Sequence, residues 1–149
     1  MTESPRWEPR NPEFEHAVRD SFARQAHMGT LGARLTRIEP GAVDITAPFD
    51  ARFTQQNGYW HAGAVTSIAD SACGYAAFSL AAAGTDVLAV EFKINLLAPA
   101  RGDVFRAVAR VLRSGRTLTV CSADVFALDG DDSTLIATML STAIIREVR

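Results

Sequence analysis

The feature that most constrains the fold is one long run of small and apolar residues, 62–82, in a chain that otherwise alternates polar and apolar side chains. A run of this length predicts a helix that is buried along much of its surface. One carboxylate, Asp70, interrupts it. A charged side chain among apolar neighbours costs free energy unless it is paired or used chemically. Asp70 is therefore the first candidate functional residue.

Period-two alternation predicts strands on both sides of this helix. The expected strands are 31–38, 41–48, 87–97, 103–113, 116–128 and 134–147. In the strand 87–97 the alternation predicts one apolar face, formed by Leu88, Val90, Phe92, Ile94 and Leu96. Short turns between the later strands favour antiparallel pairing. We therefore expect an α+β fold in which a curved antiparallel sheet wraps around one long central helix.

The beginning of the chain predicts an arm followed by a second helix. Residues 1–11 are rich in Pro and charge, and we expect a flexible arm with Trp7 as its anchor. Phe14, Val18 and Phe22 recur at helical spacing, which predicts a helix over 12–28. At 149 residues, the chain is long enough for one core, so we expect a single domain over 12–149.

Composition and charge exclude several classes of function. The net charge of −2 provides no field for nucleic acid or an anionic membrane. The chain has no signal-peptide pattern and no run long enough to span a membrane, so a cytoplasmic location is expected. Cys73 and Cys121 are expected to be buried thiols, and His16, His27 and His61 lack metal-ligand spacing.

The beginning of the central helix is a second candidate site. Its first N–H groups lack partners within the helix and carry partial positive charge, which suits an oxyanion. The small residues Ala62 and Gly63 leave those groups accessible. Gly63 and Asp70 are roughly 10 Å apart along the helix axis. If both act on one bond, they must come from two chains, which predicts a homodimer with antiparallel helices and composite sites.

These residues form a recognisable motif. Gln55 and Asn57 lie in the loop before the helix, His61-Ala62-Gly63 begins it, and Asp70 follows His61 by nine positions. The motif resembles that of hotdog-fold acyl-CoA thioesterases of the phenylacetate-degradation (PaaI-like) family, over roughly residues 30–146. The resemblance implies a hotdog fold and hydrolysis of an acyl-CoA thioester, with coenzyme A as part of the substrate and no separate cofactor. By this resemblance, aromatic acyl groups are the first candidate substrates and medium-chain fatty acyl groups are the next.

The resemblance also implies roles for individual residues. Asp70 would act as nucleophile or general base, and the N–H groups at Ala62 and Gly63 would polarise the thioester carbonyl. Gln55 would orient substrate or water, and Asn57 is a weaker candidate for the same task. The remaining expected substrate contacts are His61, Thr66, Gly74 and Arg116, with Arg116 near a turn where it could meet phosphate. A His at a helix start is more often a cap than a base.

The sequence departs from the family pattern at three positions. Ala62 replaces the first Gly after the His, Ala89 stands where some members carry Ser, and Gly74 stands where some carry a hydroxyl. The alternative of a non-catalytic acyl-CoA-binding hotdog module therefore stays open. A hotdog dehydratase is disfavoured. It needs a His paired with an acid or amide that act on carbon–hydrogen bonds, whereas here the acid lies nine residues beyond the His on an apolar helix. The motif leaves open whether two dimers associate into a homotetramer.

Overall fold

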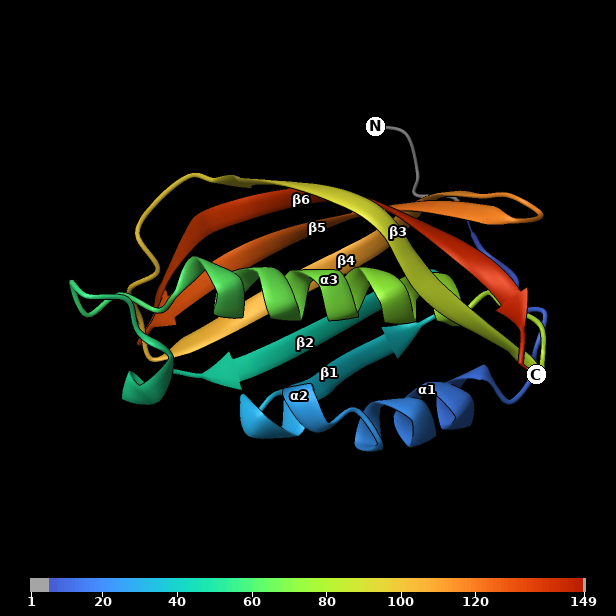
Figure 1. Ribbon diagram of the computed structural model, residues 1–149, viewed down its shortest axis with the longest axis horizontal. Helices are drawn as coiled ribbons and strands as arrows, with labels where there is room; N and C mark the ends of the chain where they lie inside the picture. Colours follow the sequence, from blue (N-terminus) through green and yellow to red (C-terminus); the bar gives the residue numbers. More distant parts are fainter. Residues whose placement is uncertain (1–5, 149) are drawn as a thin grey trace.

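The computed structural model describes residues 6–148 (Figure 1). The helices are α1 (Phe14–Ala23), α2 (Ala26–Thr30) and α3 (Ala62–Phe78), with a short 3-10 turn at Ala51–Phe53. The strands are β1 (Arg34–Glu39), β2 (Ala42–Pro48), β3 (Thr85–Leu96), β4 (Val104–Ser114), β5 (Leu118–Asp129) and β6 (Asp132–Glu147). Residues 1–5 of the expected arm lie outside the described residues.

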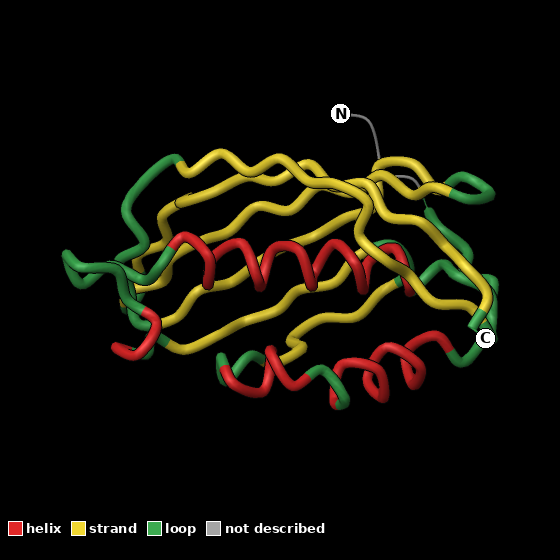
Figure 2. The backbone as a smooth tube through the Cα atoms, viewed as in Figure 1, coloured by secondary structure: helices red, strands yellow, loops and turns green. Residues whose placement is uncertain are grey.

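The six strands form one antiparallel sheet in the order β1-β2-β4-β5-β6-β3. Helix α3 lies across one face of the sheet, and α1 and α2 lie beside it along β1 (Figures 1 and 2). The expected α+β fold, with a curved sheet around a central helix, is confirmed. Strand β3 forms one edge of the sheet, although it follows α3 directly in the chain.

The core lies between α3 and the sheet. Val65, Ile68 and Ala72 are buried there, as predicted. Cys73 and Ala77 are also buried, and for Cys73 this confirms the expected buried thiol.

The expected helix over 12–28 is interrupted. Helix α1 ends at Ala23, and Gln25 adopts an extended conformation (φ −82°, ψ 94°) before α2 begins. The interruption lets the Gln25 side chain accept a hydrogen bond from Ser71 Oγ at 2.9 Å. A tertiary contact to α3 therefore outweighs the local helical pattern.

The apolar face predicted for the strand 87–97 is also broken. The pairing of β3 with β6 shifts between Ala89 and Glu91, which marks a bulge. An extra residue in one strand moves all later side chains to the opposite face. Phe92 consequently pairs with the buried Ser141 on the helix side, whereas Leu88 points away from the helix.

Trp7 fixes the described part of the arm against the turn between β1 and β2. Its indole lies so close to Gly41 that a side chain there would collide with it, and Gly41 also has a positive φ of 75°. Trp7 is partly buried against the core, as expected of an anchor. Within residues 6–148, no helix has the length and apolar character that crossing a membrane requires.

Candidate active site

Asp70 lies in the middle of α3, on the side that the sheet does not cover. It lines a pocket of about 300 Å³ between α1, α3 and the start of β3. Partial burial raises the pKa of its carboxyl, and no ion pair or hydrogen bond within the described chain offsets this effect. A carboxylate held in a pocket without a structural partner is suited to act as a nucleophile or base.

The N-terminus of α3 has one unoccupied donor. His61 Nδ1 accepts a hydrogen bond from the Gly63 N–H at 2.8 Å, so His61 caps the helix, as its position indicated. The N–H groups of Ala64 and Val65 bond to the His61 carbonyl. The expectation that the Gly63 N–H is accessible is therefore wrong. The Ala62 N–H has no partner among the described residues and is the remaining candidate donor for an oxyanion.

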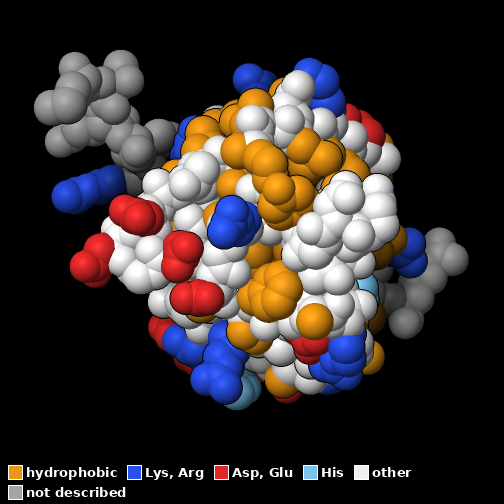
Figure 3. Space-filling view, turned by 90° about the vertical axis from the view of Figure 1, so that its left-hand side faces the viewer, with side chains coloured by type: hydrophobic (Ala, Val, Ile, Leu, Met, Phe, Trp, Pro, Cys, Tyr) orange, Lys and Arg blue, Asp and Glu red, His pale blue; other side chains and the backbone are white. Residues whose placement is uncertain are grey.

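The loop before α3 is organised around Gln55. Its Oε1 accepts hydrogen bonds from the backbone N–H groups of Asn57 and Tyr59, which closes the loop below an exposed tip. Gln55 and Ala62 line a second pocket, of about 490 Å³. The other lining residues are mostly apolar and include Tyr59, Trp60, Val65, Leu96, Leu97 and Ile136. Hydrophobic side chains gather at this end of the molecule (Figure 3).

Tyr59 and Trp60 precede α3, where an aromatic side chain can line a pocket or pack beneath the loop. Trp60 does both, because it lines the second pocket and stacks on Phe105 with ring centroids 4.3 Å apart. Its side chain is buried, and its indole N–H has no hydrogen-bond partner in the described chain. Tyr59 lines the pocket from the loop.

The two pockets share no lining residue. Ala62 and Asp70 are eight residues apart on one helix, which is about 12 Å along its axis. Within one chain, the candidate oxyanion donor and the candidate base therefore face separate sites. Strand β3 borders both pockets: Val87 and Ala89 line the one at Asp70, and Leu96 lines the one at Ala62.

The other predicted residues are less closely associated with the pockets. Gly74 lines the Asp70 pocket. The hydroxyl of Thr66 turns back to the Ala62 carbonyl at 2.7 Å. Arg116 lies in the exposed turn between β4 and β5, and it lines neither pocket; the same holds for His61 and Asn57.

Three residues of the N-terminal segment, Ser21, Arg24 and Gln25, line the Asp70 pocket but were missed from the sequence. Ser21 and Gln25 line it from α1 and the break that follows. They meet α3 through hydrogen bonds of Ser21 to Tyr75 and Gln25 to Ser71, over separations of 54 and 46 residues. No local pattern signals contacts of such range, and only the fold places this segment beside Asp70.

Neither cysteine is a candidate nucleophile. Burial raises the pKa of both thiols, that of Cys121 to about 12. A thiol held protonated at neutral pH is a poor nucleophile. In the part of the chain that the structure describes, no three His, Cys, Asp or Glu side chains gather as a metal site would need.

Comparison with known proteins shows which family has this architecture. The family model of the thioesterase superfamily matches residues 57–134. A predicted esterase of Saccharolobus solfataricus is 33% identical over 128 residues, which cover 86% of this chain and 83% of that protein. The crystal structure of a thioesterase family protein from Silicibacter pomeroyi superposes with a TM-score of 0.89 at 48% identity, covering 91% of this chain and 99% of that one. The E. coli PaaI protein of the phenylacetic acid degradation operon superposes with a TM-score of 0.81 at 20% identity, covering 94% and 96%, which shows a common hotdog fold.

Proposed function

The chain belongs to the thioesterase superfamily, and from this premise we propose that it is an acyl-CoA thioesterase that releases a free acid and coenzyme A. The observation that carries the proposal is that α3 presents both a carboxylate and a backbone N–H without a hydrogen-bond partner in the described chain. Among residues 6–148, the Asp70 carboxylate lies in a pocket without a structural partner, and the Ala62 N–H lies at the helix start without an acceptor. The spacing of His61 and Asp70 supports a PaaI-like member that acts on aromatic acyl groups first and medium-chain groups next.

The proposed reaction is attack on the thioester carbonyl carbon. Asp70 either adds to that carbon itself or removes a proton from a water that adds to it. The carbonyl oxygen gains negative charge and is stabilised by the Ala62 N–H at the positive end of the helix dipole. The carbon–sulfur bond then breaks, and coenzyme A leaves as a thiolate that takes a proton. With water as the nucleophile this step releases the free acid directly. With Asp70 as the nucleophile it leaves a mixed anhydride on Asp70, and a water then hydrolyses the anhydride to release the acid and restore the carboxylate. Gln55, whose Oε1 is held by the loop backbone, retains its amide N–H groups to orient water or substrate.

We propose that each active site forms between two copies of the chain. Strand β3 is an unpaired edge whose Val90, Phe92 and Leu96 are 55%, 43% and 55% exposed, and a long apolar edge is a template for another strand. Antiparallel pairing of two β3 strands sets the early part of one against the late part of the other. The Asp70 pocket of one copy, beside Val87, then faces the Ala62 pocket of its partner, beside Leu96.

A thiol-release assay with aromatic and aliphatic acyl-CoA substrates tests the proposed activity. Asp70→Asn should lower kcat by about 10²–10⁴-fold, because the amide neither attacks nor accepts a proton. Asp44→Asn is the matched control. Asp44 is also a partly buried carboxyl whose pKa is raised by burial, but it lies on β2 outside both pockets.

Two outcomes would contradict the proposal. Undiminished turnover by Asp70→Asn would remove Asp70 from the mechanism. Saturable binding of acyl-CoA to the wild-type protein without thiol release would favour the non-catalytic binding module instead. We also propose a cytoplasmic location, which the buried free thiols Cys73 and Cys121 support, because such thiols persist in a reducing compartment.

A further inference from the structure

Gly74 is a residue that the fold itself does not require. It lies one turn beyond Asp70 in α3 and lines the same pocket. Apart from its chain neighbours and the backbone of its own helix, a Cβ at this position would meet no atom of the described residues within 4 Å, and its backbone is ordinary right-handed helix. Glycine inside a helix destabilises it relative to alanine. Neither close packing nor backbone strain accounts for that cost, whereas open space beside Asp70 does.

The space over Gly74 is bounded on its far side by the N-terminal helices. The Tyr75 hydroxyl lies 3.3 Å from Ser21 Oγ of α1, and the Tyr75 ring makes edge contacts with Phe22 and Phe78. Phe78 also lines the pocket, at the end of α3. The pocket therefore continues from Asp70 over Gly74 to a wall that holds the aromatic rings of Tyr75 and Phe78, with the charged side chains of Arg24 and Asp86 also lining it.

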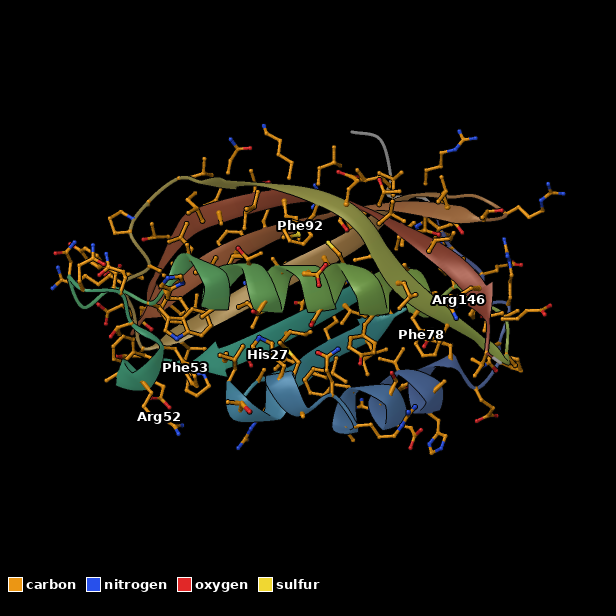
Figure 4. The ribbon with its side chains drawn as sticks, in the orientation of Figure 1. His27, Arg52, Phe53, Phe78, Phe92 and Arg146 are labelled. Carbon is orange, nitrogen blue, oxygen red and sulfur yellow. The ribbon has the colours of Figure 1, made fainter. Side chains whose placement is uncertain are left out.

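Three side-chain hydrogen bonds hold this wall against α3. They join Ser21 to Tyr75, Gln25 to Ser71, and His27 to Ser67, the last at 2.9 Å. Figure 4 shows His27 on α2, below the start of α3. All three N-terminal partners precede residue 57, where the match to the superfamily model begins. The wall is thus a feature of this chain outside the matched part of the family model.

We propose that Gly74 and helix α1 set the width of the acyl group, and that the Asp70 pocket takes an acyl group as wide as an aromatic ring lying over Gly74. A dry cavity of about 150 Å³ accommodates benzene, and this pocket holds about 300 Å³. The inference rests on the proposed thioesterase function, and it names the residue that selects the substrate. A side chain at position 74 would occupy the space that an aromatic ring needs, whereas a narrow acyl group would still fit.

The test compares kcat/KM for phenylacetyl-CoA and acetyl-CoA in Gly74→Ala and Gly74→Leu. We expect the ratio of phenylacetyl-CoA to acetyl-CoA to fall at least about tenfold in Gly74→Leu and less in Gly74→Ala, since one methylene at a pocket wall changes selectivity by about 10–200-fold. Gly29→Leu is the matched control, because Gly29 is a helical glycine of α2 with nothing within 4 Å and lies outside both pockets. It should leave the ratio as in the wild type.

The results distinguish a failure of the inference about Gly74 from a failure of the proposed thioesterase function. A ratio that stays unchanged in Gly74→Leu, or equal losses on both substrates, would overturn the inference while leaving the thioesterase assignment standing. A wild-type protein that hydrolyses neither thioester would overturn the proposed function and the inference with it. A thermal melt of each variant shows that it folds; Gly74→Leu should melt at or above the wild-type temperature, because Leu favours helix over Gly.

Discussion

At the scale of single residues, Asp70 combines a cost to stability with a chemical use. Its carboxyl is partly buried, and burial alone raises its pKa. In the unfolded chain the group titrates at its ordinary, lower value. Between the two pKa values the folded protein binds more protons than the unfolded chain, so wild-type stability falls as pH rises through this window. Asp70 is therefore retained despite a penalty at neutral pH.

The matching prediction concerns the thermal stability of Asp70→Asn as a function of pH. The variant carries no titrating group at this position, so its melting temperature should exceed that of the wild type at about pH 7, and the difference should shrink as pH falls to about 3. Melting curves across this range measure the difference. A gap that widens toward low pH would mean that the folded protein stabilises the Asp70 carboxylate instead.

At the scale of elements, the first N–H groups of α3 differ in their availability: those that cap the helix are hydrogen-bonded, and that of Ala62 is open to a substrate. His61 Nδ1 accepts the hydrogen bond of the Gly63 N–H, and the His61 carbonyl accepts those of the next two N–H groups. Among these first N–H groups of the described helix, that of Ala62 alone remains a free donor. Ala62 is also the first helical residue, a position that tolerates proline. His61 has φ −64° and ψ 141°, which suits a residue that precedes proline.

Ala62→Pro should therefore remove the candidate oxyanion donor with little change to the fold. We expect kcat to fall about 10²–10³-fold, the usual cost of losing one oxyanion donor, while the melting temperature stays near that of the wild type. Ala62→Gly retains the N–H and is the control for altered side-chain size. Wild-type kcat in Ala62→Pro would exclude this N–H from the mechanism.

At the scale of the whole molecule, one chain is half of each proposed site. The Asp70 and Ala62 pockets lie about 12 Å apart along α3 and share no lining residue. The exposed apolar edge at β3 borders both of them. A homodimer paired along this edge accounts for the unpaired strand and for the separation of the two catalytic groups.

Mixing two inactive variants tests this assembly. In a mixed dimer of Asp70→Asn and Ala62→Pro, one site receives both substitutions and the other receives neither. Co-expressed or refolded mixtures should recover roughly a quarter of wild-type activity, because about half of the dimers are mixed and each retains one intact site. Each variant alone supplies the baseline. If mixing recovers nothing although mixed dimers form, the catalytic groups act within one chain.

Local patterns in the sequence were enough to predict most of the helices and strands and to single out the carboxylate of Asp70. The apolar run predicted α3 with its start at residue 62, and alternation placed six strands within a few residues of their observed bounds. Asp70 stood out because a charge in an apolar helix is costly. The capping role of His61 followed from its position at the helix start. These features depend on neighbours within a few residues, which the sequence displays directly.

The tertiary structure decided everything that depends on distant neighbours. The hydrogen bond from Ser71 to Gln25 accompanies the break in the predicted helix 12–28, and the bulge in β3 moves Phe92 to the helix side. The Gly63 N–H is occupied, and the wall of the Asp70 pocket comes from α1. Sequence by itself determined most of the secondary structure and the chemistry available on α3. Which groups are open and what surrounds them came only from packing, because segments dozens of residues apart compete for the same contacts.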